Sequence, residues 1–163
     1  MNKILLIEDD VTLRENTAEL LELSNYTVIT APNGKVGVEM AINMLPNLIV
    51  CDIMMPELDG YGVLEALAHK EKTKHIPFIF LSAKTERKDV RKGMDLGADD
   101  YITKPFEEEE LLSAIESRLA KAEILKDLRG DEDQIKVEEP EMKSLNDLKN
   151  FFDDSGKIIN YSE

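Results

Sequence analysis

Residues 48–60 read LIVCDIMMPELDG, and the rest of the chain can be understood from this segment outward. Its first four residues are apolar without a polar break, and proline flanks them at Pro46 and Pro56. Such a run predicts a strand that is buried on both faces of a sheet. The run ends at Asp52, and a carboxylate at the end of a buried strand costs free energy unless other groups compensate it. The sequence beyond this segment is therefore expected to supply those groups.

The composition is that of an acidic, soluble globular protein. The 163 residues carry a formal net charge of −14, with 42% of them apolar and 33% charged. These fractions are typical of a globular domain, and the acidic excess disfavours nucleic-acid binding by this chain. No apolar run has the length of a membrane span or the pattern of a signal peptide. The single cysteine, Cys51, excludes an intrachain disulfide framework, so we expect a cytoplasmic protein without membrane contacts.

Strand patterns and helix patterns alternate five times along residues 1–125. This alternation predicts an α/β fold, in which a five-stranded parallel sheet is covered by helices on both faces. The crossovers between parallel strands are expected to be right-handed. The last helix begins near Glu107 and is expected to end between about 125 and 129. The predicted strands are residues 3–7, 26–31, 48–51, 77–81 and 100–103, and the helix before the last strand is residues 85–96.

Polar residues follow four of the five predicted strands. Glu8 and Asp9 follow the first strand, Asp52 the third, Ser82 the fourth and Lys104 the fifth. In open parallel sheets the ligand site lies at this carboxyl edge. Three converging carboxylates repel one another, so they either take up protons or hold a cation. Oxygen ligands without nearby His or Cys favour a hard divalent ion, and Mg²⁺ is the expected one, although these residues do not distinguish it from Ca²⁺ or Mn²⁺.

A carboxylate surrounded by a metal ion, an ammonium group and a hydroxyl is a receptor for a phosphoryl group. Aspartate can act as a phosphoryl acceptor, and a cation together with Lys104 would neutralise the charge on the transferring oxygens. Each of Asp52, Ser82 and Lys104 alone is typical of a cap, a turn or a surface position. Their occurrence at successive strand ends favours the functional interpretation.

Residues 1–125 resemble the receiver domain of bacterial two-component response regulators. The resemblance rests on KILLIEDD, LIVCDIMMPELDG, FIFLSAK and GADDYITKPF, in this order and at the usual spacing. It implies a doubly wound, flavodoxin-like (βα)5 fold with strand order 2-1-3-4-5. It also implies a phosphorylation-activated switch rather than an enzyme: the domain catalyses its own phosphorylation by a histidine kinase or phosphotransfer protein and loses the phosphate slowly.

The resemblance assigns the acceptor and the metal ligands. Asp52 corresponds to the phosphorylated residue. Mg²⁺ would be bound by Asp9, by Asp52 and by the backbone carbonyl of Met54, with Glu8 acting through a water molecule. These roles are expectations that follow from the family pattern.

The resemblance also assigns the switch. Ser82 and Lys104 would contact the phosphoryl group, and Tyr101 would turn inward when Ser82 moves. The peptide bond before Pro105 is usually cis in the family. Phosphorylation is expected to change the face formed by the 85–96 helix, the fifth strand and the last helix, through which a homodimer can form.

Two further features bear on the lifetime and the output of the signal. Met54 and Lys84 stand two residues beyond Asp52 and Ser82. In the family that the chain resembles, side chains at these positions flank the hydrolytic water, so the resemblance implies that Met54 and Lys84 tune dephosphorylation. Gly93 lowers the stability of the 85–96 helix by roughly 1 kcal/mol relative to alanine. That helix is therefore expected to be the moving part.

Two other functions were weighed against the switch. A haloacid-dehalogenase-type phosphatase also uses an aspartate nucleophile and Mg²⁺, but it needs a second aspartate where this chain has Met54, and its nucleophile usually follows the first strand. A receiver-like binding module that is never phosphorylated is disfavoured, because no member of the site is missing.

The composition changes near the C-terminus. Residues 131–163 contain ten acidic and four basic residues, and residues 130–143 are interpreted as an acidic linker. Residues 144–163 regain an apolar pattern and are interpreted as a tail or as the truncated start of an effector domain. Their sequence, SLNDLKNFFDDSGKIINYSE, weakly resembles the opening of a Crp/Fnr-like cyclic-nucleotide-binding domain.

Overall fold

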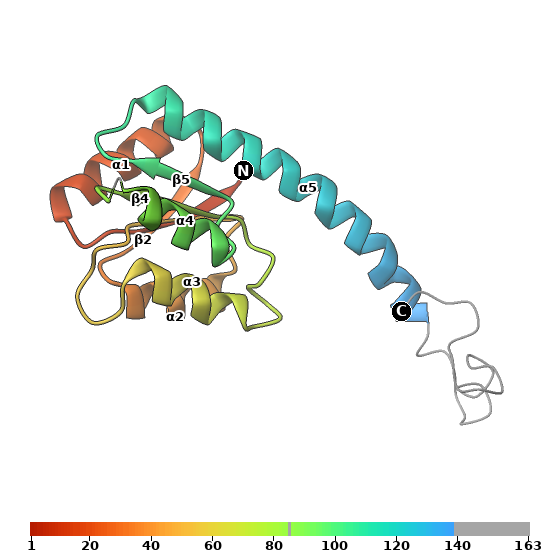
Figure 1. Cartoon of the computed structure of the whole chain (residues 1–163). Helices are drawn as coiled ribbons and strands as arrows, with labels where there is room; N and C mark the ends of the chain where they lie inside the picture. The colour runs from red at the N-terminus through yellow and green to blue at the C-terminus, as the bar shows by residue number, and fades with distance from the viewer. Residues whose placement is uncertain (85, 139–163) are drawn as a thin grey trace. The chain divides into compact units, whose positions relative to one another are not determined.

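A computed structural model describes residues 1–84 and 86–138 of the chain, with the side chains of 131–138 left out. The chain divides into two compact units, Met1–Ala122 and Glu123–Glu163, and the sheet and the site belong to the first. Strands and helices alternate throughout the first unit, as the sequence predicts (Figure 1). The elements are β1 (Lys3–Ile7), α1 (Val11–Leu23), β2 (Thr27–Ala31), α2 (Gly34–Met44), β3 (Leu48–Cys51), α3 (Gly60–Ala68), β4 (Phe78–Ser82), α4 (Arg87–Asp95), β5 (Asp100–Thr103) and α5 (Glu108–Glu138).

The five strands form one parallel sheet in the order β2-β1-β3-β4-β5. This confirms both the fold class and the strand order expected from the sequence. β3 lies at the centre of the sheet, and all four of its residues are buried. Asp52 directly follows β3, so the fold places this carboxylate at the middle of the carboxyl edge.

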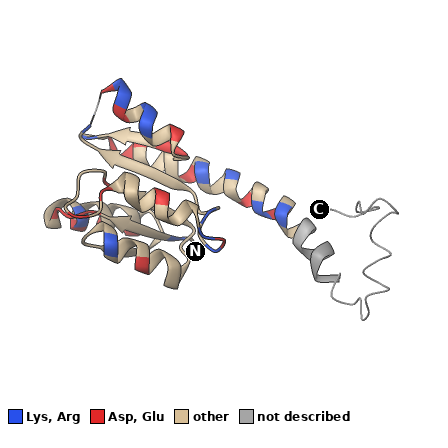
Figure 2. Ribbon diagram, turned by 60° about the horizontal axis from the view of Figure 1, so that its bottom comes forward, with Lys and Arg blue, Asp and Glu red and all other residues tan. Residues whose placement is uncertain are grey.

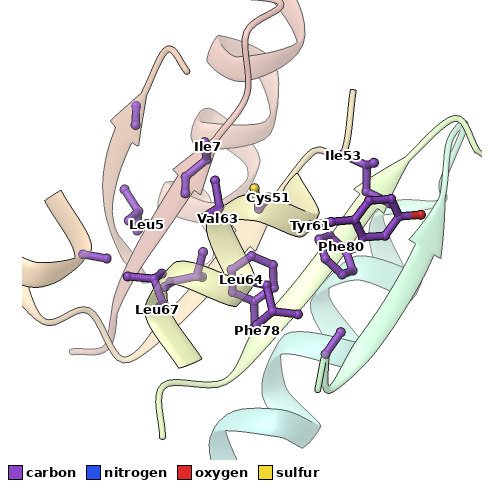
Figure 3. Packing of buried hydrophobic residues seen from close by; sticks show 14 of the residues in the cluster. Leu5, Ile7, Cys51, Ile53, Tyr61, Val63, Leu64, Leu67, Phe78 and Phe80 are labelled. Atoms are coloured by element: carbon purple, nitrogen blue, oxygen red, sulfur yellow. The ribbon is translucent and has the colours of Figure 1, made fainter. Parts of the chain in front are cut away.

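Successive side chains of β3 pack into two different cores. Ile49 and Cys51 join the core beneath α2 and α3, whereas Leu48 and Val50 join the core beneath α1 and α5. Figure 1 shows these helix pairs on opposite faces of the sheet, and Figure 3 shows the first core at close range. Alternate strand residues point to opposite faces, so burial on both faces requires an unbroken apolar run. Figure 2 agrees, because the strands are largely free of Lys, Arg, Asp and Glu.

Side-chain caps define where several helices begin. The carboxylate of Asp10 accepts a hydrogen bond from Leu13 N at 2.9 Å, as its position before α1 predicts. Asp59 accepts from Gly62 N at 2.9 Å, and α3 begins directly after it, at Gly60. Gly97 has φ of 106° and follows the end of α4, where glycine adopts the left-handed region without steric cost.

The last helix is longer than the sequence suggests. α5 runs from Glu108 to Glu138, whereas the expected end was between 125 and 129. Residues 130–138, interpreted as the start of a linker, are helical, because their acidic composition does not break a helix. The proposed tail or effector start at 144–163 lies outside the described residues. Within the described part of the chain, no helix has the length and apolar content needed to cross a membrane.

Gly93 is the only buried residue of α4, and its role differs from the one expected. A Cβ at this position would lie 3.0 Å from two ring atoms of Phe80 and 3.2 Å from the ring of Tyr101. The glycine therefore allows α4 to approach the aromatic side chains of β4 and β5 closely. Close packing of α4 on these rings therefore requires a residue without a side chain at position 93. This packing role is separate from the expected effect of Gly93 on helix stability.

Candidate functional site

The backbone brings the four functional segments together at the carboxyl edge of the sheet. The N–H of Asp52 donates to the carbonyl of Ile7 at 3.0 Å, and the N–H of Lys104 donates to the carbonyl of Ser82 at 2.9 Å. These bonds extend the strand pairing to the first residue beyond β3 and β5. The side chains that follow β1, β3 and β5 and the last side chain of β4, Ser82, therefore lie at the same edge of the sheet.

The three carboxylates meet as the sequence predicts. Oxygen atoms of Glu8, Asp9 and Asp52 all lie within 4.8 Å of one another. Glu8 is 2% exposed and Asp52 is 7% exposed, whereas Asp9 lies at the surface. The site is thus two buried carboxylates with a third at the opening to solvent.

Lys104 supplies the positive charge. Its Nζ lies 2.8 Å from Glu8 Oε1 and 3.3 Å from Asp52 Oδ2. The Lys104–Pro105 peptide bond is cis, in agreement with the expectation from the family. The ammonium group therefore bridges the two buried carboxylates, and it contacts Glu8 more closely than the expected acceptor.

Burial and the neighbouring charges shift the pKa values of Glu8 and Lys104. Burial is the largest cause that raises the pKa of Glu8, and the neighbouring Asp52 raises it further, so that it reaches about 7 although Lys104 opposes the shift. Burial acts to lower the pKa of Lys104, but the hydrogen bond to Glu8 and the charge of Asp52 outweigh it, and the pKa is raised. Burial therefore favours the neutral form of Glu8, while the acidic partners of Lys104 favour its charged form.

The free energy of unfolding of the metal-free protein should fall as the pH rises from about 5 to about 8. Glu8 keeps its proton up to about pH 7 in the folded state, whereas its ordinary pKa is 4.5. The folded state therefore binds more protons in this window, and its advantage, up to about 3 kcal/mol, is lost as the pH passes through the folded pKa. Urea unfolding of wild type and Glu8→Gln in EDTA measures this difference. An equal pH slope in both proteins would contradict the assignment.

The donor set fits a divalent cation. The clustered side-chain ligands are all carboxylate oxygens, which suit Mg²⁺. Three carboxylates face the ammonium group of Lys104 here, so a divalent cation would balance charge that Lys104 alone does not. Asp9, at the solvent opening, is the carboxylate that a hydrated ion meets first.

Ser82 and Tyr101 lie beside the cluster. Ser82 is fully buried, and its Oγ accepts a hydrogen bond from the N–H of Lys84 at 3.2 Å. The Tyr101 hydroxyl donates to the carbonyl of Lys84 at 2.8 Å. The ring of Tyr101 is thus turned toward the segment between β4 and α4, and both side chains are tied to the same residue.

Met54 and Lys84 line one open cleft close to Asp52 in the chain. This cleft has a volume of about 420 Å³ and is also lined by Ile53, Met55, Pro56 and Asp59. Met54 is 59% exposed. The ammonium of Lys84 lies 3.8 Å from Asp89 Oδ1, so in this structure it is directed to α4 as well as to the cleft.

Two residues of this region were not found by sequence reasoning. Arg14 donates from Nη1 to the carbonyl of Glu8 at 2.8 Å. Tyr61 donates from its hydroxyl to the carbonyl of Asp89 at 3.0 Å. Both bonds use backbone carbonyls as acceptors, and every residue has one, so no residue pattern along the chain indicates them.

The protein is thus a doubly wound α/β domain, with a cluster of three carboxylates and one lysine at the carboxyl edge of its parallel sheet. The family model described as "Response regulator receiver domain" matches residues 4–116. The chain therefore belongs to the response regulator receiver family. This membership also separates it from the dehalogenase-type phosphatases.

Individual relatives agree with this family. The DNA-binding dual master transcriptional regulator RpaA of Synechocystis is 37% identical over 123 residues, which are 76% of this chain and 51% of that protein. A response regulator receiver domain protein from Clostridium thermocellum has a TM-score of 0.72 at 27% identity, over 77% of this chain and 99% of the other. The chain spans about half the length of the curated relatives it matches.

One solved relative was determined with a metal ion. The receiver domain of the sensor histidine kinase PA1611 from Pseudomonas aeruginosa has a magnesium ion coordinated in the active site cleft. It is 27% identical, with a TM-score of 0.69 over 73% of this chain and 98% of the other.

Proposed function

We propose that Asp52 is the phosphoryl acceptor of this receiver domain, with Ser82 and Lys104 as the residues that contact the phosphoryl group. The observation that carries the proposal is the position of Asp52 at the end of the central strand, with Lys104 Nζ at 3.3 Å and two further carboxylates beside it. A purely structural carboxylate does not need this surplus of acidic groups. The receiver family to which the chain belongs supports the same assignment.

Each residue of the site has its own role in the proposed phosphoryl transfer. A carboxylate oxygen of Asp52 attacks the phosphorus of the donor, a P–O bond forms, and the bond to the leaving group breaks. Lys104 neutralises charge on the transferring oxygens, and the Ser82 hydroxyl donates to one of them. Mg²⁺ bound by Asp9, Asp52 and the Met54 carbonyl, with Glu8 acting through water, would supply further positive charge at the same oxygens. The buried position of Asp52 limits access of water to the product.

The output is proposed to pass through Ser82 and Tyr101. A phosphoryl group on Asp52 is a new partner for the Ser82 hydroxyl, which now accepts from Lys84 N. Movement of Ser82 would act on the Lys84 segment, to which Tyr101 is also bonded. Phosphorylation would thus bias an existing equilibrium of the face formed by α4, β5 and α5.

The phospho-donor is proposed to be a histidine kinase or a phosphotransfer protein of the cytoplasm. A homodimer through α4, β5 and α5 is part of this proposal, supported by exposed charges of both signs on α4, among them Arg91 and Asp95. The curated relatives are about twice as long and are described as transcriptional regulators. Control of transcription by a larger protein containing this domain is therefore also a proposal, with no nucleic acid bound by the domain itself.

The phosphorylated form is expected to be lost slowly, and Met54→Asn with Lys84→Glu should accelerate the loss. A thioether cannot orient a water molecule as an amide can, and a protonated lysine is no general base. We expect at least about tenfold faster decay of the phosphoprotein in the presence of Mg²⁺, below the ~10²–10⁴-fold contribution of a full general base. Lys88→Glu makes the same charge change on α4, outside the cleft, and is the control. Unchanged or slower decay in the double variant would show that other groups govern water access.

A further inference from the structure

Tyr61 forms a bridge between the acceptor loop and α4. It lies in the first turn of α3, which follows the loop from Asp52, and it is only 6% exposed. Its hydroxyl donates to the carbonyl of Asp89 in the first turn of α4 at 3.0 Å. The ammonium of Lys92, one turn further along α4, lies 4.4 Å from the centre of the ring. Tyr61 therefore holds the start of α4 with both its hydroxyl and its ring.

The same side chain contacts the proposed switch. The rings of Tyr61 and Phe80 pack edge to face, with centres 5.4 Å apart (Figure 3), and those of Phe80 and Tyr101 are 5.9 Å apart. Burial is the largest cause that raises the pKa of Tyr61 to about 12, with smaller contributions from Tyr101 and Asp89, so the phenol is protonated at neutral pH. It is thus always able to donate its hydrogen bond to α4.

The bonds of Tyr61 and Tyr101 enclose one short segment. Tyr101 holds the carbonyl of Lys84, and Tyr61 holds the carbonyl of Asp89. Lys84 and Asp89 are themselves joined by an ion pair of 3.8 Å. Lys84 N donates to the Ser82 hydroxyl. The two phenols therefore bind the backbone carbonyls of the two residues that form this ion pair.

We propose that Tyr61 is a positioning residue that couples the acceptor site to α4. Its hydroxyl bond orders the segment between Ser82 and α4, and a phosphoryl group at Asp52 uses the ordered segment through Ser82. Binding to a site that is already ordered causes a smaller loss of conformational entropy. Loss of the hydroxyl should therefore weaken binding of a phosphoryl mimic, although the residue does not touch the site. The inference rests on the proposed function of Asp52.

The test is the affinity of the full chain for beryllofluoride in the presence of Mg²⁺, compared between wild type and Tyr61→Phe. Phenylalanine keeps the ring contacts with Phe80 and Lys92 and removes only the hydroxyl. One net hydrogen bond corresponds to about a two- to tenfold loss of affinity. Faster hydrogen exchange of residues 86–95 in the unbound variant should accompany it. Tyr26→Phe removes a phenolic hydroxyl from the other core and is the matched control, with unchanged affinity and exchange.

Each result decides between the two proposals. Equal beryllofluoride affinity of Tyr61→Phe and wild type overturns the coupling role and leaves the role of Asp52 intact. A weakened Mg²⁺ affinity of Tyr61→Phe, measured without beryllofluoride, also overturns it, because it reveals general damage to the site. Failure of wild type to bind beryllofluoride overturns the proposed function, and the inference with it.

Discussion

Asp52→Asn is expected to abolish phosphorylation of the chain by acetyl phosphate and Mg²⁺. The amide keeps the size of the side chain and one acceptor oxygen, but it is a poor nucleophile toward phosphorus. Wild type should gain one acid-labile phosphate, measured by the intact mass of the protein, and the variant should gain none. The effect is all-or-none because the described site contains one carboxylate at the end of the central strand, in contact with Lys104 Nζ at 3.3 Å.

Asp10→Asn is the matched control. Asp10 lies at the surface beside the site and caps α1, and asparagine caps a helix about as well as aspartate does. This variant should take up phosphate like wild type. An acid-labile phosphate on Asp52→Asn would contradict the acceptor assignment. No phosphate on wild type would favour the remaining alternative, a receiver-like module that is never phosphorylated.

Asp9→Ala is expected to lower the affinity for Mg²⁺ by about 100-fold or more, and Glu8→Ala by about tenfold. The reason is the different position of the two side chains. Asp9 is exposed and has no hydrogen bond or ion pair among those found in the described structure that would compete with a cation, whereas Glu8 is buried and bound to Lys104 Nζ at 2.8 Å. Glu8 is therefore expected to act on the ion through water.

Titration calorimetry with Mg²⁺ near pH 8 measures both affinities. At this pH Glu8 is largely ionised, since its pKa is about 7, so its protonation does not obscure the comparison. Asp10→Asn again serves as a control, because it removes one negative charge next to the same site without removing an expected ligand. Equal losses in Asp9→Ala and Glu8→Ala would contradict the division of roles between direct ligand and water-mediated ligand.

The residue patterns along the sequence determined the fold class and which residues form the site. The unbroken apolar run of β3 predicts burial on both faces, and the alternation of five strand and helix patterns predicts a parallel sheet. Once the strands are parallel, the residues at the carboxyl ends of β1, β3, β4 and β5 must lie at one edge of the sheet. Asp9, Asp52, Ser82 and Lys104 could therefore be named without coordinates, since their proximity follows from topology alone.

Only the tertiary structure decided how the members of the site interact. The closer contact of Lys104 with Glu8 than with Asp52, and the raised pKa of Glu8, depend on burial and on distances of a few tenths of an ångström. The same holds for Gly93, whose missing side chain admits the ring of Phe80. Sequence patterns report which face of an element is buried, but not which atom of another element it meets.

The end of α5 and the hydrogen bond of Tyr61 also could not be predicted from the sequence. Acidic residues beyond 130 are compatible with either a linker or a helix, so composition could not place the end of α5 at Glu138. Tyr61 fits the apolar face of α3 as a core residue, which it is. Its hydroxyl bond to the Asp89 carbonyl exists because the fold brings the first turns of α3 and α4 together, 28 residues apart in sequence, and backbone acceptors carry no sequence signal.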